Sequence, residues 1–239
     1  MVSDEETSAR PSYLDSLESL VAIRTDQLRK SIGDLERSYD ILVESFGDAL
    51  ALKDSETEKH SKRVTAFTIA LASAAGLPLD RIAVIARGAF LHDVGKIATH
   101  DVILRKPSEL TSDEITTMRE HCLRGYEMVK TVPFLVEAAE IVYAHHERYD
   151  GTGYPRGLKG DEIPLGARLV AVANTLDSIM SDLPYRPAQS LGAAREEIRR
   201  ESGCQFDPAV VKTFLSMPDN IWDDLRRQIG TKANESADA

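Results

Sequence analysis

Five of the six histidines in this chain recur in a pattern that also contains acidic residues. The pattern consists of His60, the dyad His92-Asp93, His121 and the adjacent pair His145-His146. Imidazole and carboxylate side chains are the usual protein ligands of zinc, iron, manganese and similar cations. We therefore expect a site for two or more metal ions, and a phosphate ester is a natural substrate for such a site.

The spacing of these residues lets several side chains reach one cluster. Glu56 and His60 are four residues apart, so on one helix they share a face. His92 and Asp93 are adjacent, about 100° apart around a helix, and can approach a cluster from two sides. A carboxylate can also bridge two cations. Facing helices of a bundle are a known way to build sites with several metals.

The segments that must position these residues read as helices. The patterns predict helices near 54–75, 79–93, 134–148, 165–181 and 190–202, and a further helix that begins at Asp207-Pro208. Thr111 to Glu114 has the form of a capping box and should open a helix that includes His121. The loop 148–164 is rich in glycine and proline and cannot be helical. Because no segment alternates with period two for long, the predicted fold is all-α.

A second pattern lies upstream of the histidines. Apolar residues recur there at alternating spacings of four and three, at Leu28, Ile32, Leu35, Tyr39, Leu42, Phe46 and Ala49. This is a heptad seam, although Glu18 and Thr25 weaken its earlier part. A helix over 13–52 would be roughly 60 Å long. We interpret it as a parallel dimer stalk; the alternative is a helix that folds back onto its own domain.

The expected organisation therefore has four parts. Residues 1–12 form a disordered N-terminus, 13–52 the helical stalk, 53–229 the catalytic domain and 230–239 a disordered tail. The N-terminus lacks the apolar core of a signal peptide, and no run of 18 apolar residues predicts a membrane span.

Charge and cysteine content narrow the function further. A net charge of −10 argues against binding a nucleic-acid polymer, which needs a basic surface. The negative net charge does not exclude binding of a small anionic substrate, because metal ions supply positive charge locally. Cys122 and Cys204 form no CxxC pair, and we interpret them as reduced packing residues of a cytoplasmic protein.

Two motifs resemble a known family. Leu91-His92-Asp93-Val94-Gly95-Lys96 resembles the HD superfamily of metal-dependent phosphohydrolases. His145-His146-Glu147, followed by Asp150-Gly151-Thr152-Gly153-Tyr154-Pro155, is similar to the HD-GYP subfamily, which hydrolyses cyclic di-GMP. HD alone is a weak signal, whereas the longer string is specific. The resemblance runs from about Asp54 to Phe214 and implies an HD-type helical bundle behind the N-terminal coiled-coil-like helix.

The resemblance also implies roles for individual residues. It makes His60, His92, Asp93, His121, His145 and His146 metal ligands, with Asp93 bridging two metals. Glu56 stands where some members support a third metal, so two or three divalent ions are implied, with Fe or Mn favoured and Zn or Ni possible. Lys96 would contact the phosphate and steady the leaving oxygen, and Tyr185 and Arg186 would bind substrate. The loop with Asp150, Gly151, Gly153, Tyr154 and Pro155 is a candidate partner surface.

The chain departs from the family at two positions. Asn174 stands where a metal-binding aspartate is expected; an amide oxygen can ligate but carries no charge, so one metal would be weaker or missing. Leu183 stands where an arginine normally meets the nucleotide, and leucine makes no charge-assisted bond to phosphate. Arg186 keeps a second basic position.

Three functions remain open after these departures. The first is hydrolysis of cyclic di-GMP to pGpG or GMP. The second is a weakened domain that acts as a nucleotide sensor or protein adaptor. The third is an HD phosphohydrolase of another nucleotide. In each case the stalk suggests an output module that is driven by a sensor, either on a partner protein or upstream in a longer chain.

Overall fold

The computed structural model describes residues 5–53, 57–106, 108–182 and 186–235. It divides into two units, residues 1–45 and 46–239, each of which is considered by itself. The helices are α1 (Glu5–Lys53), α2 (Thr57–Ala74), α3 (Leu79–Leu91), η1 (Val94–Ala98), α4 (Asp101–Leu104), α5 (Ser112–Arg119), α6 (His121–Val129), η2 (Pro133–Leu135), α7 (Val136–Ala144), η3 (Gly160–Glu162), α8 (Leu165–Met180), α9 (Leu191–Arg200), α10 (Pro208–Ser216) and α11 (Asp219–Glu235). The predicted all-α class is confirmed, since the described part of the chain contains no strand.

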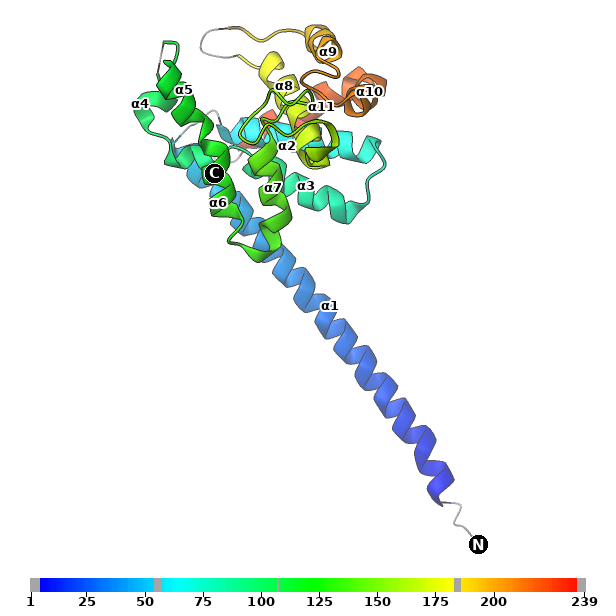
Figure 1. Cartoon of the computed structure of the whole chain (residues 1–239). Helices are drawn as coiled ribbons and strands as arrows, with labels where there is room; N and C mark the ends of the chain where they lie inside the picture. The colour runs from blue at the N-terminus through cyan, green and yellow to red at the C-terminus, as the bar shows by residue number, and fades with distance from the viewer. Residues whose placement is uncertain (1–4, 54–56, 107, 183–185, 236–239) are drawn as a thin grey trace. The chain divides into compact units, whose positions relative to one another are not determined.

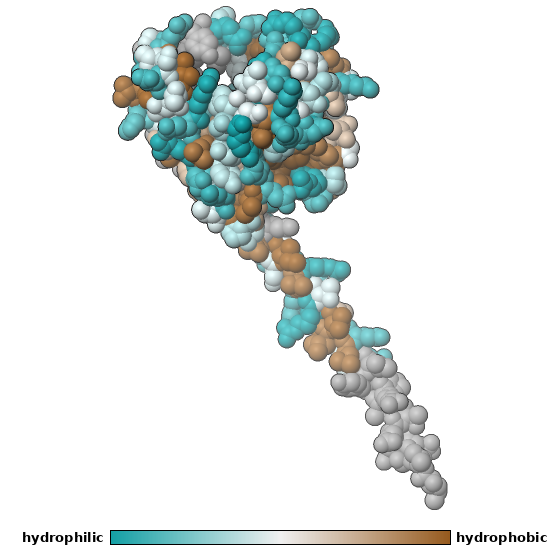
Figure 2. All heavy atoms as spheres, viewed as in Figure 1, coloured by the Kyte–Doolittle hydropathy of each residue, from teal (hydrophilic) through white to brown (hydrophobic). Residues whose placement is uncertain are grey.

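The first unit is a stretch of α1, and most of its large apolar side chains face solvent, although Val43 is buried. Leu28, Ile32 and Leu35 of the predicted seam are 62%, 48% and 50% exposed. Figure 2 shows such apolar side chains along this helix among hydrophilic ones. α1 begins at Glu5, within the segment expected to be disordered, and α11 continues to Glu235, within the expected disordered tail.

The second unit is a helical bundle built around α2. Helices α3, α8, α10 and α11 all contact α2 (Figure 1). Phe67 of α2 is fully buried and meets the ring of Trp222 from α11 edge-on, with ring centroids 5.6 Å apart. Burying a side chain of this size stabilises the fold by about 1.5–3 kcal/mol. α2 is thereby anchored as the helix that carries His60.

α2 ends where the sequence predicted. Gly76 has φ +76°, and the N–H groups of Gly76 and Leu77 donate to the carbonyls of Ser73 and Ala72 at 3.0 and 3.1 Å. These two bonds form a Schellman motif, which requires a residue with positive φ and therefore favours glycine.

The histidine motifs lie at helix ends, which differs from the expectation that they lie inside helices. α3 ends at Leu91, just before His92, and α7 ends at Ala144, just before His145. The predicted helix through His121 is broken at Glu120, so that His121 begins α6. A continuous helix would turn neighbouring residues about 100° apart, whereas a helix end lets both members of a dyad face one centre.

Candidate metal centre

Four helices bring the predicted histidines together. His60 lies in the first turn of α2, His92 follows the end of α3, His121 begins α6, and His145 and His146 follow the end of α7. Consecutive imidazole rings in the cluster lie with centroids 4.1 to 5.3 Å apart. The predicted convergence of His60, His92, His121, His145 and His146 is therefore present in the structure.

Backbone carbonyls orient three of these rings. Nδ1 of His92, His121 and His145 lies 2.7 Å from the carbonyl oxygen of Ala89, Met118 and Val142, respectively. Each of these carbonyls belongs to the last turn of its helix, where carbonyls lack an intrahelical partner. Because the carbonyl can only accept, the Nδ1 atom donates, and Nε2 of each ring carries the free lone pair.

These lone pairs meet without a proton between them. Nε2 of His121 and Nε2 of His145 are 3.3 Å apart. Nε2 of His92 is buried and has no hydrogen-bond partner among the described residues. Facing lone pairs and a buried unpaired nitrogen are both unfavourable by themselves, and a cation bound by the nitrogens relieves both.

Asp93 lies at the centre of the cluster. One carboxylate oxygen is 3.5 Å from Nε2 of His121 and 4.0 Å from Nε2 of His145, while the other is 3.3 Å from Nε2 of His92. Lys96 donates to that second oxygen at 2.7 Å. Burial alone would raise the pKa of Asp93, but the Lys96 ammonium holds it well below its usual range.

Three of the histidines are kept neutral by their surroundings. Burial lowers the pKa of His121, and burial together with the neighbouring His146 imidazole lowers the pKa of His145 well below its usual value. Burial and the nearby His121 imidazole lower the pKa of His146 to about 3. Neutral imidazole is the form that ligates metal, so the cluster is prepared for binding at neutral pH.

His60 is oriented by a side chain rather than by the backbone. Its Nδ1 lies 2.7 Å from Asp177, which is fully buried and also accepts two bonds from the Arg63 guanidinium. Burial would raise the pKa of Asp177, but the bonds from His60 and Arg63 lower it. The sequence analysis missed this role of Asp177. The signal that could have found it is its position three residues after Asn174, on the same helix.

The loop with Asp150, Gly151, Gly153, Tyr154 and Pro155 folds back onto the histidines. Tyr154 stacks on His146, with ring centroids 4.8 Å apart and planes 21° apart. A Cβ on Gly153 would lie 2.2 Å from the backbone nitrogen of Arg148, so only glycine permits this approach. The buried Glu147 carboxylate accepts from the N–H groups of Arg156 and Leu158 and ties the loop down, a role that sequence reasoning also missed.

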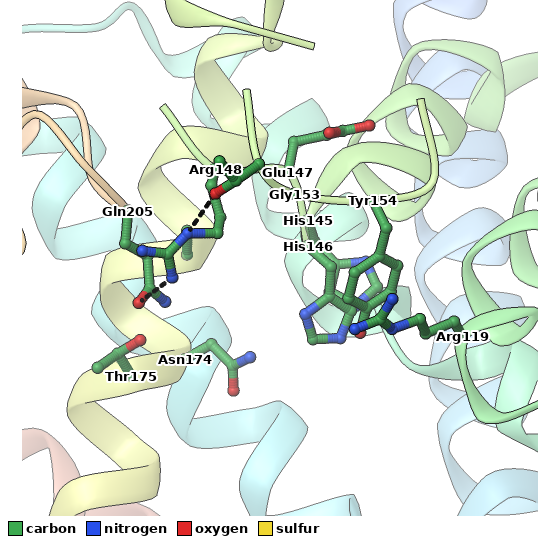
Figure 3. Close-up of a pocket in the computed structure, with 12 residues that line it drawn as sticks. Arg119, His145, His146, Glu147, Arg148, Gly153, Tyr154, Asn174, Thr175 and Gln205 are labelled. Atoms are coloured by element: carbon green, nitrogen blue, oxygen red, sulfur yellow. Dashed lines mark hydrogen bonds between the residues drawn. The ribbon is translucent and has the colours of Figure 1, made fainter. Parts of the chain in front are cut away.

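A pocket opens beside His145 and His146. Asn174, Thr175, Arg119, Tyr154, Arg148 and Gln205 are among the residues that line it. In Figure 3 the two histidines, Tyr154 and Arg119 lie on one side, Arg148 and Gln205 on the other, and Asn174 between them. The Arg119 guanidinium lies 4.7 Å from the centroid of the Tyr154 ring. The pocket thus offers cationic and amide groups next to the cluster.

Other predicted residues lie elsewhere or outside the described part of the chain. Glu56 and Tyr185 fall outside the described residues. Arg186 donates to the carbonyl of Ser178 at 2.8 Å and does not line the pocket. His100 is exposed at the start of α4, as expected.

The donor atoms form two groups that could each hold a cation. One consists of His60, His92 and Asp93, and the other of His121, Cys122, His145 and His146; within each group the donor atoms lie within 4.8 Å of one another. Nitrogen-rich sets with a carboxylate suit divalent first-row metals. The residues therefore fit the divalent metal ions that their motifs imply. Cys122 was not expected in this group.

Comparison with known proteins agrees with this geometry. The chain is 36% identical over 221 residues to a cyclic di-GMP phosphodiesterase of Thermotoga maritima, covering 92% of this chain and 60% of that protein. It is 33% identical over 194 residues to 3′3′-cGAMP-specific phosphodiesterase 2 of Vibrio cholerae, covering 80% of this chain and 36% of that protein. The chain thus spans less than two thirds of the length of each of these relatives.

Structural similarity extends the comparison to the fold. A solved cyclic GMP-AMP specific phosphodiesterase from Vibrio cholerae superposes with a TM-score of 0.60 at 19% identity, covering 79% of this chain and 52% of that one.

No described helix is both long enough and apolar enough to cross a bilayer. The sequence pattern of the HD domain matches residues 44–210, which is most of the chain. This chain belongs to the HD domain family, and it carries the HD-GYP signature in its loop after His146.

Proposed function

We propose that this chain hydrolyses a 3′–5′ phosphodiester bond of cyclic di-GMP, giving pGpG or GMP. The observation that carries the proposal is the set of imidazoles whose Nε2 atoms converge around Asp93. The similarity to the Thermotoga maritima phosphodiesterase supports the choice of substrate. Divalent cations held there, with Fe or Mn favoured, activate water near neutral pH and offset the charge on phosphoryl oxygens.

The remaining groups have separate tasks in this proposal. Asp93 is ionised and presents its two oxygens to different histidines, which is the arrangement expected of a bridging ligand. Lys96 is held at the cluster by Asp93, so that its ammonium can donate to the phosphate and steady the leaving oxygen. The pocket beside His145 and His146 is where we place the nucleotide.

The direct test is turnover by the purified chain. It is loaded with Mn²⁺, or with Fe²⁺ under anaerobic conditions, and incubated with cyclic di-GMP while products are separated by chromatography. We expect pGpG or GMP from the wild type and none from Asp93→Asn. Asp161→Asn is the matched control, since the Asp161 side chain is 86% exposed and lies outside the cluster. If neither pGpG nor GMP forms with Mn²⁺ or with Fe²⁺, the proposal is wrong.

A second candidate is a weakened domain that senses the nucleotide or serves as an adaptor. Asn174 favours it, because this uncharged side chain lines the pocket beside the histidines where the family carries a carboxylate. The double variant Asn174→Asp, Leu183→Arg should then hydrolyse cyclic di-GMP while the wild type only binds it. Equal rates for the two proteins would eliminate this candidate.

A third candidate is a different cyclic dinucleotide as substrate. The 33% identity to the cGAMP-specific relative and the absence of an arginine at Leu183 favour it. Rates with cyclic di-GMP, 3′3′-cGAMP and mononucleotides, measured side by side on one metal-loaded preparation, decide between the two substrates.

The exposed seam of α1 supports a homodimer through residues 13–52. Apolar residues at heptad spacing are exposed in the single chain, and a parallel partner would cover them. We expect Ile32→Lys with Leu35→Lys to give monomers in sedimentation. Ile23→Lys is the matched control, because Ile23 is 56% exposed but lies outside the seam. A wild type that sediments as a monomer would remove the dimer.

Two further partners belong to this proposal. The loop around Tyr154 offers a surface for a signalling protein, and a sensor domain upstream or on a partner would drive the catalytic unit through α1. Neither cysteine forms a disulfide, which fits a reducing compartment such as the cytoplasm.

A further inference from the structure

We propose that Cys122 is a thiolate ligand of one cation in this centre, together with His121 and His145, so that the Asp93 carboxylate beside these two histidines remains available to the same cation. The inference deepens the proposed function, because it concerns the same metal site. Cys122 is fully buried, and its sulfur lies with the donor nitrogens of the three histidines in a group whose members are all within 4.8 Å of one another. The motif that identified the other ligands contains no cysteine.

The distances between donor atoms fit a tetrahedral N/S site. Metal–nitrogen bonds of about 2.05 Å and metal–sulfur bonds of about 2.3 Å at tetrahedral angles place two nitrogens about 3.4 Å apart and a nitrogen and a sulfur about 3.6 Å apart. The structure has 3.3 Å between Nε2 of His121 and Nε2 of His145, and 3.5 Å between Sγ of Cys122 and Nε2 of His121. Both edges match to about 0.1 Å.

The competing explanation is a packing thiol that donates a weak hydrogen bond to His121. A single S–H proton could satisfy Nε2 of His121, but it would leave the lone pair of His145 facing that same nitrogen at 3.3 Å. Both Nδ1 atoms already donate to backbone carbonyls, so neither ring has a second proton to offer. A cation bound by the two nitrogens and the sulfur satisfies all three donors at once.

The ligand set has a chemical consequence. On coordination the thiol releases its proton to solvent and contributes one negative charge. That charge partly compensates for Asn174, which is neutral where the family carries a carboxylate. A thiolate ligand also raises the affinity of a site for zinc, cobalt and iron relative to manganese and magnesium. One cation position of the centre would therefore be selective for these softer metals.

Cobalt substitution tests the proposal by spectroscopy. The full metal-free chain is titrated with Co²⁺, and the thiolate-to-cobalt charge-transfer band in the near ultraviolet is followed together with bound cobalt. We expect the band in the wild type and in Cys204→Ser, which removes the exposed cysteine and serves as the matched control. In Cys122→Ser the band should be lost while cobalt still binds. A band unchanged in Cys122→Ser, or no band in fully loaded wild type, overturns the proposal.

A second measurement uses only the wild type, so its outcome does not depend on whether Cys122→Ser folds. X-ray absorption on the zinc-loaded wild type should show a sulfur neighbour at about 2.3 Å beside nitrogen neighbours. A zinc shell of nitrogen and oxygen alone refutes thiolate ligation. The two proposals fail separately: a cobalt–thiolate band without hydrolysis leaves the ligand set intact but removes the enzymatic function, and hydrolysis without the band does the reverse.

Discussion

The centre contains two kinds of histidine that are held in different ways. His92, His121 and His145 follow or begin helices and donate Nδ1–H to carbonyls in the last turn of a helix. His60 lies within α2 and is held by the buried Asp177 carboxylate, which Arg63 also contacts. A backbone carbonyl is neutral and cannot be removed by substitution, whereas a carboxylate raises ligand basicity and can be removed.

This difference divides the centre into two parts with separate sensitivities. The helix-end histidines depend on how the helices are placed, and any substitution that moves a helix end moves several donors together. His60 depends on one side chain more than 110 residues away in sequence.

The largest effect is expected from Gly95→Ala. A Cβ at this position would lie 1.9 Å from the carbonyl oxygen of His121 and 2.6 Å from the nitrogen of Gly125, so η1 and α6 must separate. We expect loss of bound metal and a destabilisation of about 1–3 kcal/mol or more, measured by elemental analysis and thermal unfolding. Gly192→Ala is the control, since its Cβ meets only the Ser190 hydroxyl at 3.7 Å. Full metal content in Gly95→Ala would refute the dependence on helix placement.

Asp177→Asn should weaken one cation position and spare the other. Asparagine keeps the shape but removes the charge that orients His60 and pairs with Arg63. Loss of such a supporting carboxylate typically costs about 10–100-fold in metal affinity, to be measured by competition with a chelator. Asp161→Asn, at an exposed carboxylate, should leave both positions unchanged. Equal weakening of both positions would show that His60 is not held separately.

The helix-end histidines should give the metal-free protein a pH-dependent stability. The pKa values of His121, His145 and His146 are lowered by folding, so below the unfolded value of about 6.5 the unfolded chain binds more protons. The free energy of unfolding should therefore fall as pH falls from 7 to 5, by up to about 1.4 kcal/mol per pH unit for each buried histidine. The lowered pKa of Asp93 also makes the free energy of unfolding fall as pH falls, but only below the unfolded pKa of an aspartate, about 3.9.

Denaturant unfolding in the presence of a chelator at pH 7, 6 and 5 measures this slope. His145→Gln should flatten it, while His100→Gln, at an exposed histidine, should not. A wild type whose stability does not change over this range contradicts the prediction.

The smallest effect is expected from Thr111→Ala. Thr111 and Glu114 form a reciprocal capping box at the start of α5, whose other end supplies the Met118 carbonyl for His121. Loss of the cap should cost about 1 kcal/mol in unfolding free energy and leave metal content unchanged. Thr116→Ala, whose hydroxyl donates only to the carbonyl of Ser112, is the control. A loss of metal in Thr111→Ala would show that the cap of α5 also positions His121.

The sequence predicted much of the fold because its local signals agree with its packing. The Thr111 capping box, the Gly76 helix end and the Asp207-Pro208 helix start are all present in the structure. Each depends on contacts within a few residues along the chain, so a short segment contains the information. The histidine set was predicted from residue type and grouping in the same way.

The sequence alone determined that the five clustered histidines and Asp93 could ligate metal, that helices would carry them and that Asn174 departs from the family. Only the tertiary structure decided where the helices stop, that Asp177 holds His60 and that Cys122 lies among the histidines. The physical reason is that these features depend on contacts between helices far apart in sequence. The local sequence gives no stop before His92 or His145, yet the structure ends α3 at Leu91 and α7 at Ala144.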